Sequence, residues 1–206
     1  MRDERIGDFL TQLAARVPAP GGGAVAALHA AQAAALVGMV ARYSTGERYA
    51  EHRDIIERVT AEADRLRDEA LRLAEADAAA FTAVTEAYRL PKDTDEAKGA
   101  RSVAIARALA GAGKPPAEVI QVAQVVVELA EEILPVGNRN VITDVAAAAE
   151  AARAAATTAR VNVEINLGGV RDELVHGKLT AAAARVPALV ARAERLTAAV
   201  RERIAV

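Results

Sequence analysis

The chain has 206 residues and a formal net charge of −2; alanine fills about a quarter of it, aromatic residues 2%, and cysteine and tryptophan are absent. This length suits one domain with a substantial core. The lack of cysteine excludes disulfides and thiolate chemistry, and the lack of a basic block argues against nucleic-acid binding. A charged N-terminus without an apolar signal segment favours a soluble, cytoplasmic protein. The apolar run 24–41 is rich in alanine, which inserts weakly, so it indicates a buried helix and no membrane contact.

Alanine, leucine, arginine and glutamate are strong helix formers, and proline and glycine clusters divide the chain into helical segments. The segment 161–167 (VNVEINL) has some strand character, but its flanks favour a helix. The sequence therefore predicts an all-α fold, an antiparallel bundle of long helices in a single domain spanning 1–206. The expected helices cover about 3–15, 23–43, 47–88, 93–111, 115–134 and 141–166, followed by a last one to 206 that is interrupted near Gly177 and kinked near Pro187.

Three consecutive glycines, Gly21, Gly22 and Gly23, follow Pro18-Ala19-Pro20 and open directly into the second helix. Glycine permits positive φ and close approach of a ligand, and a helix N-terminus presents free N–H groups that suit an anion. A tight turn between two helices explains the same pattern equally well. We therefore treat these glycines as candidate binding residues.

The third helix carries an apolar stripe at alternating spacings of three and four residues, and a single acid, Asp77, interrupts it. A carboxylate on a buried face is costly unless it is paired, hydrogen-bonded or protonated. Such a carboxyl group is suited to general acid–base catalysis. The alternative is an ion pair between Asp77 and an arginine of a neighbouring helix.

Lys92 follows the break at Leu90-Pro91, which places its ammonium group at one end of the bundle, where it is either a site residue or simply solvated. Further on, Glu173 and His176 match half of a di-iron carboxylate signature, but no second copy is present. We therefore expect no metal.

The sixth helix places Asp144 near its start and Asn162 and Asn166 near its end. Asp144 and Asn162 lie five turns apart on one face, about 27 Å along the axis, so they cannot bind one small ligand within a single chain. They mark either the two ends of a packed face or two sites completed by different subunits. Alternatively, Asp144 stabilises the helix dipole and the asparagines form hydrogen bonds between helices.

Three segments together resemble the cyclodeaminase/cyclohydrolase family, which occurs as the second domain of formiminotransferase-cyclodeaminase and as stand-alone methenyltetrahydrofolate cyclohydrolases. The segments are PAPGGGAVAAL at 18–28, EADAAAFTAV with YRLPKDTDEAK within 75–98, and NRNVITDVAAAAEAA with ARVNVEINL, ending at 167. The chain departs from the family at Ala24, where a serine is common, and at Ala76, which is commonly acidic or polar.

This resemblance implies an all-α bundle that forms a homodimer and acts on a reduced folate, without a metal or redox cofactor. The expected reactions are hydrolysis of methenyltetrahydrofolate to formyltetrahydrofolate and deaminating cyclisation of formiminotetrahydrofolate. The catalytic candidates are Asp77, Asp144 and Lys92. The candidate substrate-binding residues are the glycines 21–23, Asn140, Asn162 and Asn166.

Two other functions stay open at this point. In the first, the chain is a divergent, inactive member of the fold that binds folate or another ligand; Ala24 keeps this alternative open. In the second, it is a helical scaffold. A buried carboxylate at Asp77 argues against the scaffold, because a scaffold gains nothing from it.

Overall fold

The computed structural model describes residues 3–205, and over that range all the regular structure is helical. Helices fill this range because each proline and glycine cluster ends one helix and allows the next to begin. The long helices are α2 (Gly22–Arg42), α3 (Arg53–Arg89), α4 (Asp95–Ala112), α5 (Lys114–Val136), α6 (Thr143–Leu167) and α8 (Val186–Ile204), and the shorter ones are α1 (Ile6–Ala14), α7 (Glu173–Ala184) and two 3-10 turns, η1 (Glu47–His52) and η2 (Arg139–Val141).

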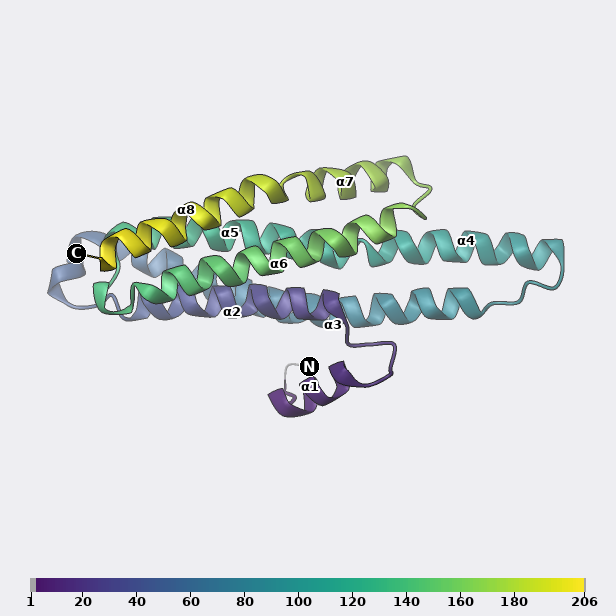
Figure 1. The fold of residues 1–206 in the computed structure, drawn as a ribbon, viewed down its shortest axis with the longest axis horizontal. Helices are drawn as coiled ribbons and strands as arrows, with labels where there is room; N and C mark the ends of the chain where they lie inside the picture. Colours follow the sequence, from purple (N-terminus) through teal and green to yellow (C-terminus); the bar gives the residue numbers. More distant parts are fainter. Residues whose placement is uncertain (1–2, 206) are drawn as a thin grey trace.

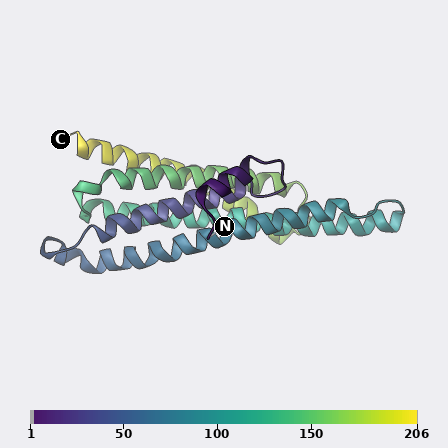
Figure 2. The ribbon, with the colours of Figure 1, turned by 90° about the horizontal axis from the view of Figure 1, so that it is seen from below.

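The helices pack lengthwise, with α2 in contact with α3, α5 and α6 (Figure 1). The second half of α3 and most of α4 form a two-helix hairpin that extends beyond the other helices (Figure 2). Helix α1 lies outside the bundle, joined to α2 by the segment 15–21.

Alanine makes the close helix contacts of the core. Ala27, Ala30 and Ala34 of α2 and Ala148 and Ala152 of α6 are completely buried. Small side chains let helix axes approach closely. The many dispersion contacts between the closely packed helices then provide the stabilisation that bulky core residues would otherwise give. The all-α bundle expected from the composition is confirmed.

The last predicted helix differs from the structure in where it breaks. Gly177 lies inside α7, and the chain breaks at Arg185, between α7 and α8. The kink expected near Pro187 is found as this break, because Pro187 lies in the first turn of α8, where its missing N–H is tolerated. A glycine within a helix costs only about 1 kcal/mol, and burial of Leu179 and Ala183 on α7 offsets that cost.

Helix α2 is the one helix of residues 3–205 that is long and apolar enough to cross a membrane. In this structure 61% of its apolar stretch is buried among the other helices.

Candidate active site

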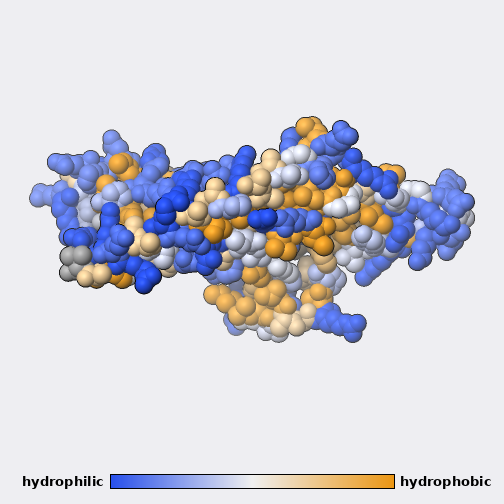
Figure 3. All heavy atoms as spheres, turned by 45° about the horizontal axis from the view of Figure 1, so that its top comes forward, coloured by the Kyte–Doolittle hydropathy of each residue, from blue (hydrophilic) through white to orange (hydrophobic). Residues whose placement is uncertain are grey.

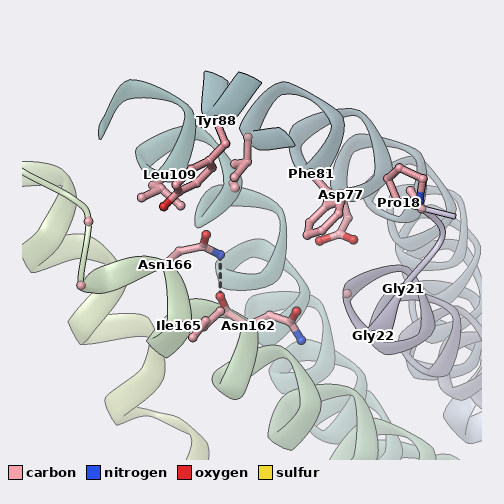
Figure 4. A pocket seen from close by; sticks show the side chains of 16 residues that line it. Pro18, Gly21, Gly22, Asp77, Phe81, Tyr88, Leu109, Asn162, Ile165 and Asn166 are labelled. Atoms are coloured by element: carbon pink, nitrogen blue, oxygen red, sulfur yellow. Dashed lines mark hydrogen bonds between the residues drawn. The ribbon is translucent and has the colours of Figure 1, made fainter. Parts of the chain in front are cut away.

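A cavity of about 520 Å³ lies where the start of α2, the middle of α3, the end of α4 and the end of α6 meet. Figure 4 shows Asp77 and Phe81 of α3 on one side of it and Asn162 and Asn166 of α6 on the other. It is lined by Pro18, Ala19, Gly21, Gly22, Gly23, Asp77, Phe81, Val84, Tyr88, Leu109, Ala112, Asn162, Ile165, Asn166, Gly168 and Gly169. The structure therefore gathers six of the nine residues singled out from the sequence.

Asp77 lies where the buried stripe of α3 opens into this cavity. The preceding stripe residues Ala70 and Leu73 are fully buried, whereas Asp77 is half-buried. No arginine pairs with it in the described part of the chain, so the expected alternative of an ion pair is wrong. Its carboxylate instead interacts with the backbone N–H of Ala24 in the first turn of α2.

Burial raises the pKa of the Asp77 carboxyl, and the Ala24 N–H opposes that rise by stabilising the charged form. Desolvation is the larger of the two effects, because the cavity wall around the carboxyl group is mostly apolar. A carboxyl group with a raised pKa holds a proton more strongly than an ordinary carboxyl group, which suits it to general acid–base catalysis.

Gly23 is required because the Asp77 carboxyl group rests against its Cα. A side-chain Cβ at this position would overlap the carboxyl carbon and both carboxylate oxygens of Asp77. Gly21 has nothing within 4 Å of such a Cβ, and at Gly22 the nearest atom is the Asn162 Nδ2 at 3.8 Å. One glycine of the three is thus fixed by the site.

These glycines do not use the positive φ that glycine permits. Gly21 is extended, with φ −141° and ψ −159°, and among the described glycines only Gly46 has positive φ. The expected anion site is present, but the carboxylate of Asp77 occupies the start of α2.

Asn162 and Asn166 present their amide oxygens to the cavity. The Asn162 Nδ2 donates to the Thr158 carbonyl at 2.9 Å, and the Asn166 Nδ2 donates to the Asn162 carbonyl at 2.7 Å (Figure 4). These bonds lie within α6, so the predicted hydrogen bonds between helices are absent for both side chains. Neither amide oxygen has a hydrogen-bond partner in residues 3–205, which leaves two acceptors for a ligand.

Lys92 is not beside Asp77, since the last turn of α3 is already about 18 Å from that residue along the helix. It lines a second hollow of about 460 Å³ with Lys98, Arg101 and Arg171. Tyr88, Leu109, Gly168 and Gly169 line both spaces, so the hollow continues the cavity toward the tip of the hairpin. Lys92 is therefore too far from Asp77 in this chain to exchange a proton with it directly, whereas its position suits an anionic group.

Asp144 and Asn140 lie at the opposite end of α6 from the cavity. Asn140 is exposed in η2, and its N–H donates to the Asn138 side chain at 3.0 Å. Neither residue lines the cavity of its own chain, so neither binds a ligand together with Asp77 there.

Comparison with known proteins identifies the family of this chain. Residues 5–185 match the formiminotransferase-cyclodeaminase family. The chain belongs to that family. It is 39% identical over 171 residues to the methenyltetrahydrofolate cyclohydrolase of Methylorubrum extorquens, covering 82% of each chain. It is 33% identical to mouse formimidoyltransferase-cyclodeaminase, covering 85% of this chain and 33% of the mouse protein.

A solved structure shows the same fold for this family. The formiminotetrahydrofolate cyclodeaminase of Thermotoga maritima superposes with a TM-score of 0.82 and 27% identity, over 97% of this chain and 98% of that one. The chain spans about a third of the mouse enzyme, but nearly all of the Thermotoga protein.

The aromatic wall of the cavity was missed from the sequence. Phe81 and Tyr88 are two of only five aromatic residues in the chain, and they lie two turns apart on α3. Their side chains are about half exposed, at 48% and 52%, and both line the cavity. These two residues could have been identified from the sequence, because aromatic residues are rare in this chain and these two follow Asp77 at helical spacing.

Proposed function

We propose that the cavity interconverts one-carbon derivatives of tetrahydrofolate, with hydrolysis of methenyltetrahydrofolate as its principal reaction. One observation carries this proposal: the single carboxyl group of the cavity, Asp77, is half-buried without a paired cation, opposite two amide oxygens. A bound amidinium supplies the missing positive charge. Support comes from the 39% identical relative of similar length, which is named as a cyclohydrolase.

The reaction is an addition followed by a bond cleavage. Water adds to the carbon that bridges the two folate nitrogens while Asp77 accepts one of its protons. One C–N bond then breaks, the leaving nitrogen takes up a proton, and the hydroxyl group loses its own proton to give the formyl C=O. The net change consumes one water and releases one proton. Asp77 is suited to this role because it both attracts the cation and cycles a proton.

The other walls suit the remainder of a folate. The flat rings of Phe81 and Tyr88 offer surfaces for an aromatic heterocycle, and the Asn162 and Asn166 oxygens accept hydrogen bonds from its N–H groups. These contacts orient the one-carbon unit toward Asp77.

Cyclisation of formiminotetrahydrofolate is the second candidate, favoured by the fold shared with the Thermotoga cyclodeaminase. In that reaction a folate nitrogen attacks the formimino carbon, the imino nitrogen gains protons, and ammonia leaves as its C–N bond breaks. The Asp77 carboxyl group can act as the acid–base group in this reaction too, because both reactions pass through a carbon bonded to two folate nitrogens.

Two assays on the purified chain test the proposal. Hydrolysis removes the near-ultraviolet absorbance band of methenyltetrahydrofolate, and cyclisation releases ammonia from formiminotetrahydrofolate. Turnover in the first assay supports the principal reaction, and turnover in the second alone supports the other. If the chain is inactive in both assays although circular dichroism shows an intact fold, the proposal is wrong and the chain is a ligand-binding or scaffolding protein.

The basic hollow beside the cavity fits the anionic tail of the substrate. Lys92, Arg101 and Arg171 surround a space that continues from the cavity, so the carboxylates of a glutamate tail lie there when the heterocycle sits at Asp77. Lys92→Glu is expected to raise KM about fivefold with kcat unchanged, since an exposed charge pair is worth up to about 1 kcal/mol. Lys178→Glu, an exposed lysine on α7, is the matched control and leaves KM unchanged.

The effect of Lys92→Glu is expected to shrink as salt is raised, because the charges are solvated. An unchanged KM at low salt would show that the tail lies elsewhere. We also propose that the enzyme is a homodimer that needs no metal or redox cofactor, as the resemblance implies, and that it is cytoplasmic, as the composition suggests.

A further inference from the structure

One long face of the bundle is left uncovered by the fold. Helices α2 and α6 run antiparallel and in contact, so their rows of partly or fully exposed residues lie at the same levels of the bundle. Each row consists of small, apolar or uncharged polar residues over about 30 Å. This α2/α6 face comprises Val25, His29, Gln32, Ala35, Leu36 and Met39 on α2, and Ala147, Ala151, Ala154, Thr158, Val161 and Ile165 on α6.

The two ends of this face differ. The cavity opens at one end, where Ile165 is 77% exposed although it lines the cavity. Asp144 lies at the other end, about 27 Å from Asn162 and on the same side of α6. It is half-buried and has no hydrogen bond or ion pair with any other residue of 3–205. Its carboxyl group is therefore free to interact with something outside its own chain.

The cavity lacks a second acid–base group. Among its lining residues Asp77 is the only carboxyl group, and the only other ionisable side chain, Tyr88, lies about three helical turns away from it on α3. The proposed reaction needs one group that accepts a proton from water and another that protonates the leaving nitrogen. One carboxyl group performs both steps only if it moves between the two atoms.

A second copy of this chain is the occupant that suits the α2/α6 face. The rows between Asp144 and the cavity carry no formal charge other than that of a protonated His29, as the core of a stable interface requires. Two helices about 30 Å long and 10 Å wide outline about 600 Å², close to the roughly 800 Å² that each partner buries in a specific complex.

Helix α1 adds apolar surface beside this face. It has nine residues and hardly touches the other helices, and its Ile6 and Leu10 are 79% and 54% exposed. Figure 3 shows this hydrophobic lobe projecting from the bundle. So short a helix is marginal alone in water, so it needs an apolar surface that its own bundle does not provide.

We propose that two copies pack through the α2/α6 face about a two-fold axis, so that the second copy's Asp144 completes the cavity of the first. In this arrangement the axis lies in the interface at right angles to the helices, level with the middle of the face. Such an axis reverses the second copy end for end and pairs residue i with j and j with i. It therefore brings Asp144 of one copy level with Asn162 and Gly22 of the other. Each dimer then has two equivalent sites, each with Asp77 from one chain and Asp144 from the other.

This proposal rests on the proposed function for the role of Asp144, which is the second acid–base group. Asp144→Asn is expected to lower kcat about 10²-fold or more, as loss of a general acid or base does. The decisive test is a heterodimer of Asp77→Asn and Asp144→Asn chains, co-expressed with two different affinity tags and purified through both.

The shared site predicts that this heterodimer recovers about half the activity of the wild-type dimer, because one of its two sites has both carboxyl groups intact. If each site lies within one chain, both sites carry a substitution, and the heterodimer is as inactive as its parents. An inactive heterodimer would overturn the proposal. So would wild-type activity in the Asp144→Asn variant, or an active enzyme that light scattering shows to be a monomer.

Cross-linking tests the geometry without substrate, so it stands even if neither folate is turned over. The natural chain has no cysteine, so each introduced thiol is unique. A dimer that pairs an Asp144→Cys chain with an Ile165→Cys chain is expected to cross-link with a short bis-maleimide, whereas dimers of Asp144→Cys alone are not. The reverse pattern would place the second copy elsewhere.

Discussion

Replacing Asp77 with asparagine is expected to lower kcat for methenyltetrahydrofolate about 10³-fold, within the 10²- to 10⁴-fold range of a lost general acid or base. Asparagine keeps the shape of the side chain and its contact with the Ala24 N–H, but it accepts no proton and attracts the substrate cation less. The loss is read from the initial rate of the absorbance assay. Asp54→Asn, an exposed residue on the same helix, is the matched control and retains full activity.

Stability separates a catalytic role for Asp77 from a structural one. Its pKa is raised in the folded chain, so the unfolded chain loses its proton first as the pH rises. The folded state therefore loses stability from the ordinary carboxyl pKa of about 3.9 up to the raised pKa, and this loss persists at neutral pH. Asp77→Asn escapes that loss, so its Tm at pH 7 equals or exceeds that of the wild type. A clearly lower Tm would show that Asp77 mainly supports the fold.

The same pKa shift sets the pH dependence of turnover. Because the ionised form is the base, kcat/KM rises with pH as Asp77 loses its proton in the free enzyme, above the ordinary carboxyl range. A bound cation stabilises the carboxylate, so the corresponding rise in kcat occurs at lower pH. Asp77→Asn has neither rise; if the rise in kcat/KM persisted in the variant, another group would be the base.

The fold was predictable because local signals agree along most of the chain. Helix-forming residues fill the segments between proline and glycine clusters, and the apolar stripe of α3 identifies Asp77 as an exception within a buried face. Gly177 and Pro187 look equally disruptive in sequence, but the helix breaks only beside Pro187, at Arg185, and continues through Gly177. Their tolerance depends on tertiary packing and on position within the helical turn.

The site was harder to predict, because its residues meet through packing that no short motif records. Asp77 and Gly23 were chosen for separate reasons, and only the structure shows that one carboxyl group occupies the space that the missing side chain leaves. Lys92 was grouped with Asp77 through the resemblance, although about three turns at the end of α3 separate the two. Asp144 fits a site only when a second copy is considered, and a single sequence contains no information about symmetry.

Gly23→Ala is expected to lower kcat about 10²-fold, because its Cβ would overlap the carboxyl group of Asp77 and displace it. Misplacing a catalytic group by about 1 Å has an effect of this size. Gly21→Ala is the matched control within the same glycine run, since its Cβ meets no atom within 4 Å and its φ of −141° suits any residue. The control is expected to retain activity.

A double-mutant cycle shows whether the clash with Asp77 causes that effect. Alanine is favoured over glycine within a helix by up to about 1 kcal/mol, so without a clash Gly23→Ala would stabilise the first turn of α2. We expect Gly23→Ala to lower Tm in the wild type but to leave it unchanged or raise it in an Asp77→Ala background, where the carboxyl group is gone. Coupling of this sign between two substitutions reports direct contact. Equal changes of Tm in both backgrounds, or full activity in Gly23→Ala, would mean that the third glycine serves the turn and not the carboxyl group.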